Sequence, residues 1–251
     1  MEQANAHTAV ESLNGKRIVI TGGTTGIGRA IAILLGSYGA RIVTFGRHQQ
    51  QLDEALTAIR NAGGQADGIV ADSAKAEDVR RFFQQVDAKL GGLDILINCA
   101  ALGAEGLSAM DDADWRYVIE TNLVGYLATT KEALGRMQPQ KRGHIVLVGS
   151  MSADVREEGS SVYVATKSAI QGFAESLRKE VNGDGVKVSL VEPGAVGSDM
   201  QATTPEEERA NQEKGEMLRA EDIAVCVHYI LTQPLRCDVV SIQIRPHLQR
   251  I

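Results

Sequence analysis

A tyrosine and a lysine in the second half of the chain have the types and spacing of a proton-transfer pair. Tyr163 and Lys167 are four residues apart, so on a helix their side chains share one face. A phenol is a poor base at neutral pH because its ordinary pKa is about 10, but a neighbouring ammonium favours the phenolate. A tyrosine in this setting can exchange a proton with a carbonyl or alcohol oxygen. The alternative is an ordinary ion-dipole pair on an exposed helix, because this spacing alone has low specificity.

A serine lies close enough in the chain to join this pair. Ser150 directly follows the apolar run 144–149, which is typical of a buried strand. Functional groups of parallel sheets gather at the carboxyl ends of the strands. We therefore expect the Ser150 hydroxyl to hold the same substrate oxygen as the tyrosine.

The elements that must position these residues alternate along the whole chain. Short β-rich runs, most of them continuously apolar, occur at 17–21, 40–45, 68–71, 93–98, 144–149, 186–192 and 239–244. Segments with helical period lie between them at 28–38, 50–61, 76–90, 114–137, 161–181 and 220–231. This alternation predicts an α/β fold, with a doubly wound parallel sheet of about seven strands and helices on both faces. We expect one domain over residues 15–251, preceded by a flexible tail, 1–14.

A glycine-rich turn separates the first strand from the first helix and predicts a nucleotide site. Gly22 allows a tight turn, Gly26 removes a side chain where backbone meets phosphate, and Gly28 lets the helix pack against the strand. The helix N-terminus adds free N–H groups and the positive end of its dipole. The spacing differs from the standard G-x-G-x-x-G, so a glycine-rich connection without a ligand is the alternative. The expected contacts are Gly22, Thr24, Thr25, Gly26, Ile27 and Gly28.

The end of the second strand bears on which dinucleotide binds. An acidic residue there would bond a ribose 2′-hydroxyl, whereas an arginine would pair with a 2′-phosphate. No acid occurs in this stretch and Arg47 does, which favours NADP(H) over NAD(H). The alternative is that Arg47 is a solvated loop residue. Asp72, after the third strand, is placed to accept from an adenine amino group or to cap the next helix.

Composition limits the class of protein and its partners. The chain of 251 residues is 43% hydrophobic and 23% charged, which is typical of a globular protein. A net charge of -6 argues against nucleic acid, and no apolar run has the length of a membrane span. Cys99, Cys226 and Cys237 lie far apart, without CxxC spacing. We therefore expect a cytoplasmic protein with no disulfide framework and no metal site.

Together these motifs resemble the short-chain dehydrogenase/reductase superfamily, of the compact single-domain type, over about residues 16–244. The family pattern T-G-x-x-x-G-x-G is similar to Thr21, Gly22, Gly26 and Gly28, and Y-x-x-x-K is similar to Tyr163 and Lys167. The family's serine, asparagine and proline–glycine positions match Ser150, Asn122, Pro193 and Gly194. The resemblance implies a Rossmann-like fold and hydride transfer to or from a nicotinamide cofactor, with no metal.

The resemblance also implies a role for each catalytic residue. Tyr163 would be the general acid/base, and Lys167 would favour its phenolate and bind the ribose hydroxyls of the nicotinamide side. Ser150 would orient the substrate oxygen, and Asn122 would anchor a water that links Lys167 to solvent. Further cofactor contacts implied by the family pattern are Asn98, Ala100, Pro193, Gly194, Val196 and Ser198.

The chain departs from the family at two places. The family's N-N-A-G after the fourth strand is here Asn98-Cys99-Ala100-Ala101, which adds a methyl group at Ala101. The threonine common after the proline–glycine is replaced by Ser198, which keeps the hydroxyl. We expect neither change to remove activity.

The substrate pocket should lie between the loop 150–161 and the segment 195–216. The charged core of that segment follows Thr203-Thr204, which predicts a capped helix, either a solvated surface helix or a lid over the substrate. Arg156 would meet an acidic substrate, or would be a solvated residue paired with Glu157 or Glu158.

Two classes of function remain open. One is an NADP(H)-dependent carbonyl reductase or alcohol dehydrogenase acting on a small molecule, or the same chemistry with NAD(H). The other is a non-catalytic dinucleotide-binding sensor or scaffold. The complete set Asn122, Ser150, Tyr163 and Lys167 favours the enzyme. Helices 114–137 and 161–181 are expected to pair copies into a homodimer or homotetramer, unless their apolar faces are buried against their own sheet.

Overall fold

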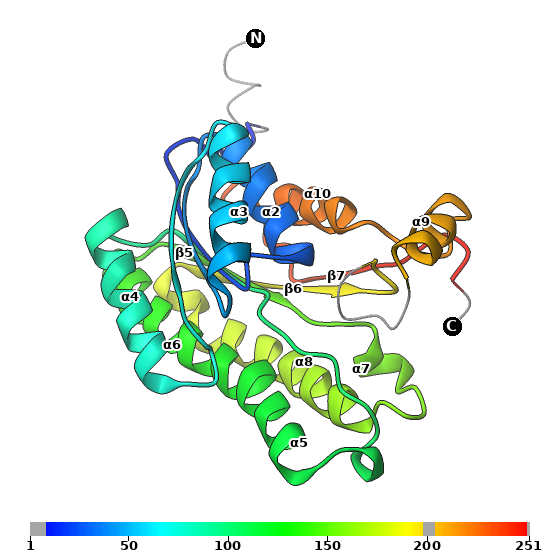
Figure 1. The fold of residues 1–251 in the computed structure, drawn as a ribbon. Helices are drawn as coiled ribbons and strands as arrows, with labels where there is room; N and C mark the ends of the chain where they lie inside the picture. The colour runs from blue at the N-terminus through cyan, green and yellow to red at the C-terminus, as the bar shows by residue number, and fades with distance from the viewer. Residues whose placement is uncertain (1–8, 198–203, 250–251) are drawn as a thin grey trace.

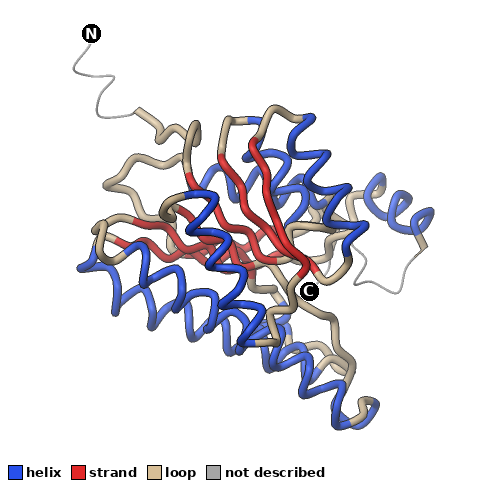
Figure 2. The backbone as a smooth tube through the Cα atoms, turned by 60° about the vertical axis from the view of Figure 1, so that its left-hand side comes forward, coloured by secondary structure: helices blue, strands red, loops and turns tan. Residues whose placement is uncertain are grey.

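The computed structural model describes residues 9–197 and 204–249 and contains one seven-stranded parallel sheet. Its strand order is β3-β2-β1-β4-β5-β6-β7, and every neighbouring pair is parallel. This confirms the predicted single-domain, doubly wound α/β fold (Figure 2). The strands are β1 Arg17–Thr21, β2 Arg41–Gly46, β3 Gln65–Val70, β4 Ile95–Asn98, β5 Gly143–Val148, β6 Val186–Pro193 and β7 Ser241–Ile244.

Helices cover both faces of the sheet (Figure 1). One face holds α2 (Gly26–Ser37), α3 (Gln49–Asn61) and α10 (Ala220–Leu231). The other face holds α4 (Ala76–Leu90), α6 (Gly125–Met137) and α8 (Ser161–Val181), with α5 (Asp112–Ile119) continuing into α6. Shorter elements are α7 (Ser152–Val155), α9 (Pro205–Glu213), the 3-10 turns Leu107–Ala109 and Asn182–Asp184, and the π-helical turn η2 (Glu120–Val124).

The strand sequences are apolar throughout because each strand is buried on both sides. In β1, Ile18 and Ile20 face the core under α2, α3 and α10, whereas Val19 faces the core under α4, α6 and α8. Leu96 of β4 likewise lies in the second core, between Ile95 and Ile97 of the first. The two cores hold the sheet rigidly, so the carboxyl ends of β1 and β4 form a fixed platform for a site.

The largest difference from the predicted elements lies in the helix expected at 114–137. It begins two residues earlier, at Asp112, and a π-helical turn at Glu120–Val124 interrupts it. A π turn inserts one extra residue into the helix and redirects the side chains after it. Asn122 sits in this turn and is fully buried. The predicted bounds of α4, α8 and α10 coincide with the observed ones, and most strand ends shift by one to three residues.

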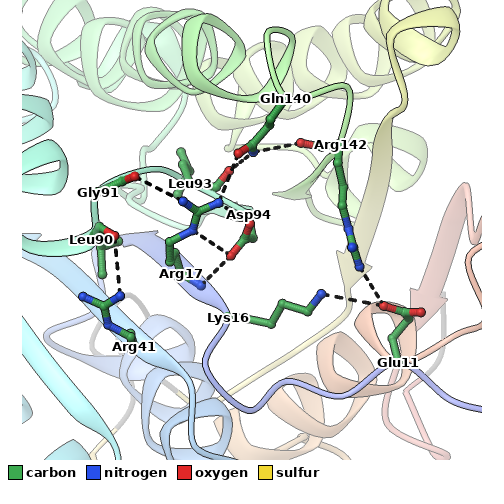
Figure 3. Close-up of polar contacts among 10 residues, drawn as sticks. All are labelled: Glu11, Lys16, Arg17, Arg41, Leu90, Gly91, Leu93, Asp94, Gln140 and Arg142. Atoms are coloured by element: carbon green, nitrogen blue, oxygen red, sulfur yellow. Dashed lines mark hydrogen bonds and ion pairs between the residues drawn. The ribbon is translucent and has the colours of Figure 1, made fainter.

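Ion pairs stabilise the amino-terminal ends of the strands, where Figure 3 shows Arg17, Asp94 and their neighbours. Arg17 begins β1, and Asp94 precedes the neighbouring strand β4. Their side chains form two hydrogen bonds, from Arg17 Nε (3.0 Å) and Nη2 (2.6 Å) to the two carboxylate oxygens. Burial alone would raise the pKa of Asp94, but the hydrogen bonds and charge of Arg17 lower it overall.

The last residues of the segment predicted as a flexible tail, 9–14, pack against these strand ends. The Glu11 carboxylate pairs with Arg142 (3.0 Å) and Lys16 (3.7 Å), as Figure 3 shows. The Glu11 N–H donates to the Thr232 carbonyl (2.9 Å), and Leu13 is 3% exposed. Residues 1–8 of that segment lie outside the described residues.

Candidate active site

A cleft of about 580 Å³ opens at the carboxyl ends of the strands. Most of the residues expected to act in catalysis or cofactor binding line it. They come from the turn after β1, the ends of β2 and β3, the segments after β4, β5 and β6, and helix α8. The predicted residues that line the cleft are Gly22, Thr24, Thr25, Gly26, Ile27, Gly28, Arg47, Asp72, Ala100, Ser150, Tyr163, Lys167, Pro193, Gly194 and Val196.

The glycine turn has room for a pyrophosphate because side chains are missing where backbone segments meet. A Cβ at Gly22, where φ is 66°, would lie 2.7 Å from the Cα of Ala100, and a Cβ at Gly28 would overlap the Gly22 carbonyl oxygen. The Gly23 N–H donates to Thr44 Oγ1 (3.1 Å), whose hydroxyl donates to the Ile20 carbonyl (2.7 Å). The turn is therefore held open at the start of α2, where free N–H groups favour an anion.

Lys167 is buried beside Tyr163 on the first two turns of α8. Its side chain is enclosed to 2% exposure, and its Nζ donates to the Val148 carbonyl (3.0 Å) at the end of β5. The same Nζ lies 5.5 Å from the ring centroid of Tyr163 and 5.7 Å from that of Tyr126. A buried ammonium has lost most of its hydration, and the carbonyl oxygen and the two aromatic rings partly compensate for that loss. The cation is therefore fixed next to the phenol that lines the cleft.

The buried Tyr126 supports the lysine from below. Its hydroxyl donates to the carbonyl of Val148 (3.0 Å), the same oxygen that accepts from Lys167. Burial raises the pKa of Tyr126 well above its ordinary value, so this phenol remains a proton donor. The Val148 carbonyl thus fixes the lysine and the supporting tyrosine at one point.

Asn122 does not line the cleft and instead supports one of its walls. Its Oδ1 accepts from the Leu102 N–H (2.7 Å), and its Nδ2 donates to the Leu102 carbonyl (2.8 Å). The amide also approaches Thr166 Oγ1 (3.4 Å) on α8. The π turn thereby ties the extended chain after β4 to the helix that bears Tyr163 and Lys167.

Ser150 lines the cleft on the side of the loop that follows β5. Its Oγ accepts from the Ser152 N–H (3.2 Å) at the start of α7. The loop then turns at Arg156, which is exposed, has a φ of 57° and donates from Nε to the Ala153 carbonyl (3.3 Å). Arg156 does not line the cleft, whereas Glu157 does. The structure thus favours the solvated loop residue, although no ion pair of Arg156 with Glu157 or Glu158 occurs in the described structure.

The predicted cofactor contact Asn98 is buried behind the cleft. Its Oδ1 accepts from Thr129 Oγ1 (2.7 Å), and its Nδ2 donates to Thr130 Oγ1 (3.0 Å). Thr21 Oγ1 accepts from the N–H groups of both Cys99 (3.0 Å) and Ala100 (3.1 Å). This polar cluster sets the path of the chain after β4, so Asn98 acts on the cleft wall through its neighbours.

Cys99 and Ala101, the two substituted positions after β4, both face the cleft. Burial raises the pKa of Cys99 to about 11, so its side chain is a thiol at neutral pH. The side chains at both positions are small, so they line the cleft without filling it. Ser198, the other predicted contact after β6, lies outside the described residues.

Arg47 and Asp72 line the far end of the cleft and are linked by a tyrosine. Arg47 Nη1 donates to the Tyr117 hydroxyl (3.2 Å), which donates to Asp72 Oδ2 (2.7 Å). The other oxygen of Asp72 accepts from the Ala74 N–H (3.0 Å) in the turn before α4, whose N-cap is Lys75, so Asp72 does not cap that helix as the sequence alternative proposed. Asp72 therefore has partners within the protein, while Arg47 keeps donors for a ligand.

The family model of the short chain dehydrogenases matches residues 16–209. The chain belongs to the short-chain dehydrogenase family. An uncharacterized oxidoreductase of Staphylococcus aureus is 34% identical over 235 residues, covering 93% of this chain and 98% of the relative. The 3-oxoacyl-(acyl-carrier-protein) reductase FabG of Haemophilus influenzae is 32% identical over 223 residues, covering 87% and 91%. The protein is thus an oxidoreductase of a family that acts on alcohol and carbonyl groups.

Solved structures of short-chain dehydrogenases share this fold over nearly the whole chain. A short chain dehydrogenase from Burkholderia cenocepacia, solved in complex with NADP, has a TM-score of 0.82 at 28% identity. The match covers 94% of this chain and 98% of that one. In the described part of this dehydrogenase, no helix is long and apolar enough to cross a membrane, and no cluster of His, Cys, Asp or Glu could hold a metal.

Several residues that the sequence did not single out line the cleft of this dehydrogenase or contact its lining, and three of them have polar groups placed to act there. Thr121 and Gln249 line the cleft, and Tyr117 stands behind Arg47 and Asp72. Thr121 is 5% exposed, and its hydroxyl has no hydrogen-bond partner among the described residues. The only sequence feature that points to Thr121 as a site residue is its position directly before Asn122. Nothing in the sequence indicated Gln249, whose Oε1 accepts from the Ala195 N–H (3.1 Å) after the chain folds back.

The described part of the predicted lid reaches this dehydrogenase's cleft only at its beginning. Ala195 and Val196 line the cleft, and Val196 forms an isolated parallel bridge with Leu218. The predicted cap at Thr204 is confirmed, because its Oγ1 accepts from the Glu207 N–H (3.3 Å) while the Glu207 carboxylate accepts from the Thr204 N–H (2.8 Å). Helix α9 is thus built as a capped unit beside the site.

Proposed function

We propose that this short-chain dehydrogenase interconverts a ketone or aldehyde and the corresponding alcohol, with NADP(H) as the favoured cofactor and Tyr163 as the general acid/base. The supporting observation is the buried Lys167 ammonium, fixed 5.5 Å from the ring centroid of Tyr163 at the cleft wall. When bound, the cofactor supplies or accepts the hydride. The protein supplies the proton and the orientation of the substrate.

Each catalytic residue has a task that its surroundings support. Ser150 donates to the substrate oxygen and holds it near Tyr163, since both residues line the cleft. Tyr163 gives its proton to that oxygen during reduction and takes it back during oxidation. Lys167 stabilises the resulting phenolate and binds the ribose hydroxyls of the nicotinamide half. A positive charge fixed in a poorly solvated site stabilises a neighbouring negative charge more strongly than the same charge would in water.

We assign Asn122 to the proton relay through its main-chain carbonyl rather than through its side-chain amide. Its side-chain amide is occupied on both sides by Leu102, so the amide is not the group that anchors a water. A π turn disrupts the regular pattern of carbonyl partners in a helix. We assign the water that links Lys167 to solvent to the main-chain carbonyl at this turn.

The choice of cofactor rests on the end of β2. Arg47 lines the cleft there and can bind a 2′-phosphate through two parallel N–H donors. Gly46, one residue earlier, has no room for an acidic side chain, because its Cβ would lie 2.9 Å from Thr24 Cβ and overlap Thr24 Oγ1. The lack of room for a carboxylate at position 46, together with Arg47, supports NADP(H) over NAD(H).

A small-molecule substrate would enter between the loop after Ser150 and the segment 195–216. The second copy in a homodimer or homotetramer would contact helices 114–137 and 161–181, where Val124 and Leu127 remain 41% and 40% exposed. The sheet-facing residues of α8 are buried in their own subunit, so only the outer side of these helices is free for pairing. The three free cysteines favour a reducing compartment, which supports a cytoplasmic location.

A screen of ketones, aldehydes and secondary alcohols with NADPH, NADH and their oxidised forms tests the proposal. Nicotinamide absorbance reports turnover, and fluorescence of the reduced cofactor reports binding. Turnover with a carbonyl or alcohol, with NADP(H) preferred, is the expected result. Cofactor binding without turnover of any substrate would favour the sensor or scaffold, and equal efficiency with NAD(H) would remove the assigned cofactor preference.

A further inference from the structure

Tyr117 joins three segments that are far apart in the sequence. It projects from α5 and places its hydroxyl between Arg47, which follows β2, and Asp72, which follows β3. The hydroxyl accepts from Arg47 Nη1 (3.2 Å) and donates to Asp72 Oδ2 (2.7 Å). Arg47 and Asp72 line the cleft, whereas Tyr117 does not. Tyr117 therefore acts on a ligand only through these two side chains.

We propose that Tyr117 is a positioning residue that holds the Arg47 guanidinium ready for the 2′-phosphate of NADP(H) and thereby sets the preference over NAD(H). The proposal rests on the function proposed above, in which Arg47 binds that phosphate. The preference for NADP(H) over NAD(H) then depends on both Arg47, after β2, and Tyr117, on α5.

The donor count of Arg47 is compatible with this role. A guanidinium has five N–H donors in a planar fork, and the contact with Tyr117 uses one donor on Nη1. The remaining donors are enough for a bidentate contact with a phosphate. Arg47 is otherwise exposed at the end of β2, and fixing such a long side chain costs conformational entropy. A hydrogen bond that fixes it before the cofactor arrives reduces that cost on binding.

The charge of Asp72 gives Tyr117 a second effect. A carboxylate in this part of the cleft repels a 2′-phosphate and attracts the Arg47 guanidinium away from it. The Tyr117 hydroxyl stands between the two side chains and supplies Asp72 with a donor. Burial and the hydrogen bond to Asp72 raise the pKa of Tyr117, so its hydroxyl remains protonated around neutral pH. The arrangement keeps Arg47 and Asp72 apart without a direct ion pair.

A double-mutant cycle on the full-length protein tests the proposal. The variants are Tyr117→Phe, Arg47→Ala and the combination, with Tyr229→Phe on α10 as the matched control, since Tyr229 is exposed and does not line the cleft. Dissociation constants for NADPH and NADH are measured by nicotinamide fluorescence. We expect Tyr117→Phe to raise the NADPH constant about 3- to 10-fold and the NADH constant less than about 2-fold. In the Arg47→Ala background, the same change should alter the NADPH constant less than about 2-fold.

Each possible outcome supports or overturns the proposal. Equal weakening of both cofactors by Tyr117→Phe would assign the tyrosine a structural role only. Additive effects of the two substitutions on NADPH would show that Tyr117 does not act through Arg47. If Arg47→Ala is selective for NADPH and Tyr117→Phe is not, the inference fails while the proposed cofactor contact stands. If Arg47→Ala itself weakens both cofactors equally, the contact and the inference fail together.

Discussion

The Lys167 ammonium lies 5.5 Å from the ring centroid of Tyr163, on the same face of α8. The sequence spacing predicts this shared face, but the structure adds that the ammonium is 2% exposed and bound to the Val148 carbonyl. The lysine cannot swing into solvent without breaking that bond. The cation is therefore a permanent part of the phenol's environment rather than a mobile surface charge.

Replacing this cation should remove most of the activity. We expect Lys167→Met, which fills a similar volume, to lower kcat by about 100-fold or more, because the phenolate loses its nearest positive charge. Lys179→Met is the control on the same helix, since Lys179 is exposed and pairs only with Glu175 (2.7 Å) among the described contacts. Steady-state kinetics with a substrate from the screen compares the two. A kcat of Lys167→Met within twofold of the parent would contradict the assigned role.

Arg47→Ala should weaken the use of NADPH far more than that of NADH. Loss of a charge-assisted phosphate contact is expected to raise the KM for NADPH about tenfold, which corresponds to about 1.4 kcal/mol. Arg116→Ala serves as control, because Arg116 stacks on Trp115 (4.3 Å) on the nearby helix α5. The measurement is the ratio of the two KM values. An unchanged ratio would refute the 2′-phosphate contact.

Thr121→Val should stabilise the free protein and weaken cofactor binding. Its buried hydroxyl lacks a partner in the described structure, and removing such a group is expected to raise the free energy of unfolding by about 1 kcal/mol. Because Thr121 lines the cleft, we expect its hydroxyl to bond the cofactor, so the dissociation constants of NADPH and NADH should both rise about threefold. Thermal unfolding and fluorescence titration measure the two effects.

Thr129→Val provides the matched contrast for that substitution. Thr129 Oγ1 donates to Asn98 Oδ1 (2.7 Å), so its removal leaves this buried oxygen with only the longer bond from Thr21 Oγ1 (3.4 Å) and should destabilise the fold by about 1 kcal/mol. A destabilising Thr121→Val would show that its hydroxyl is already satisfied in the free protein.

His144 should make the protein less stable in acid. Its Nε2 lies 2.8 Å from Ser189 Oγ, which donates to the Val239 carbonyl, so the imidazole Nε2–H is the donor to the serine. Burial, with a smaller contribution from Lys187, lowers the pKa of His144 to about 3. The unfolded chain takes up a proton below about pH 6.5, whereas the folded chain does so only near pH 3.

The free energy of unfolding should therefore fall as the pH drops from about 6.5 to 3, by up to about 1.4 kcal/mol per pH unit from this group. We expect His144→Gln, which keeps a donor for Ser189, to show a shallower slope. Urea unfolding at several pH values measures both proteins. Parallel slopes would indicate that His144 is protonated equally in the folded and unfolded states.

The sheet and the glycine turn could be predicted because local and global signals agree there. Continuous apolar runs such as Ile18–Ile20 require burial on both sides, and the glycines occur where backbone segments touch. The pair Tyr163 and Lys167 falls on one helix, so its spacing alone predicts a shared face. These features depend on short stretches of sequence.

The rest depends on contacts between distant segments, for which the sequence has no local signal. The π turn around Asn122 changes which residues face the cleft, and a regular helical period does not indicate it. Asn98 is a matched motif position, yet three buried threonines occupy its side chain. Tyr117 meets Arg47 only because α5 packs beside the ends of two strands.

The central claim is that Tyr163 transfers the proton, and Tyr163→Phe tests it most directly because the ring stays and the hydroxyl goes. Turnover of the best substrate and NADPH affinity are measured on the same preparation. We predict a loss of turnover of at least about 100-fold, with the NADPH dissociation constant changed less than about threefold. Turnover equal to that of the parent protein, with NADPH bound normally, would contradict the account.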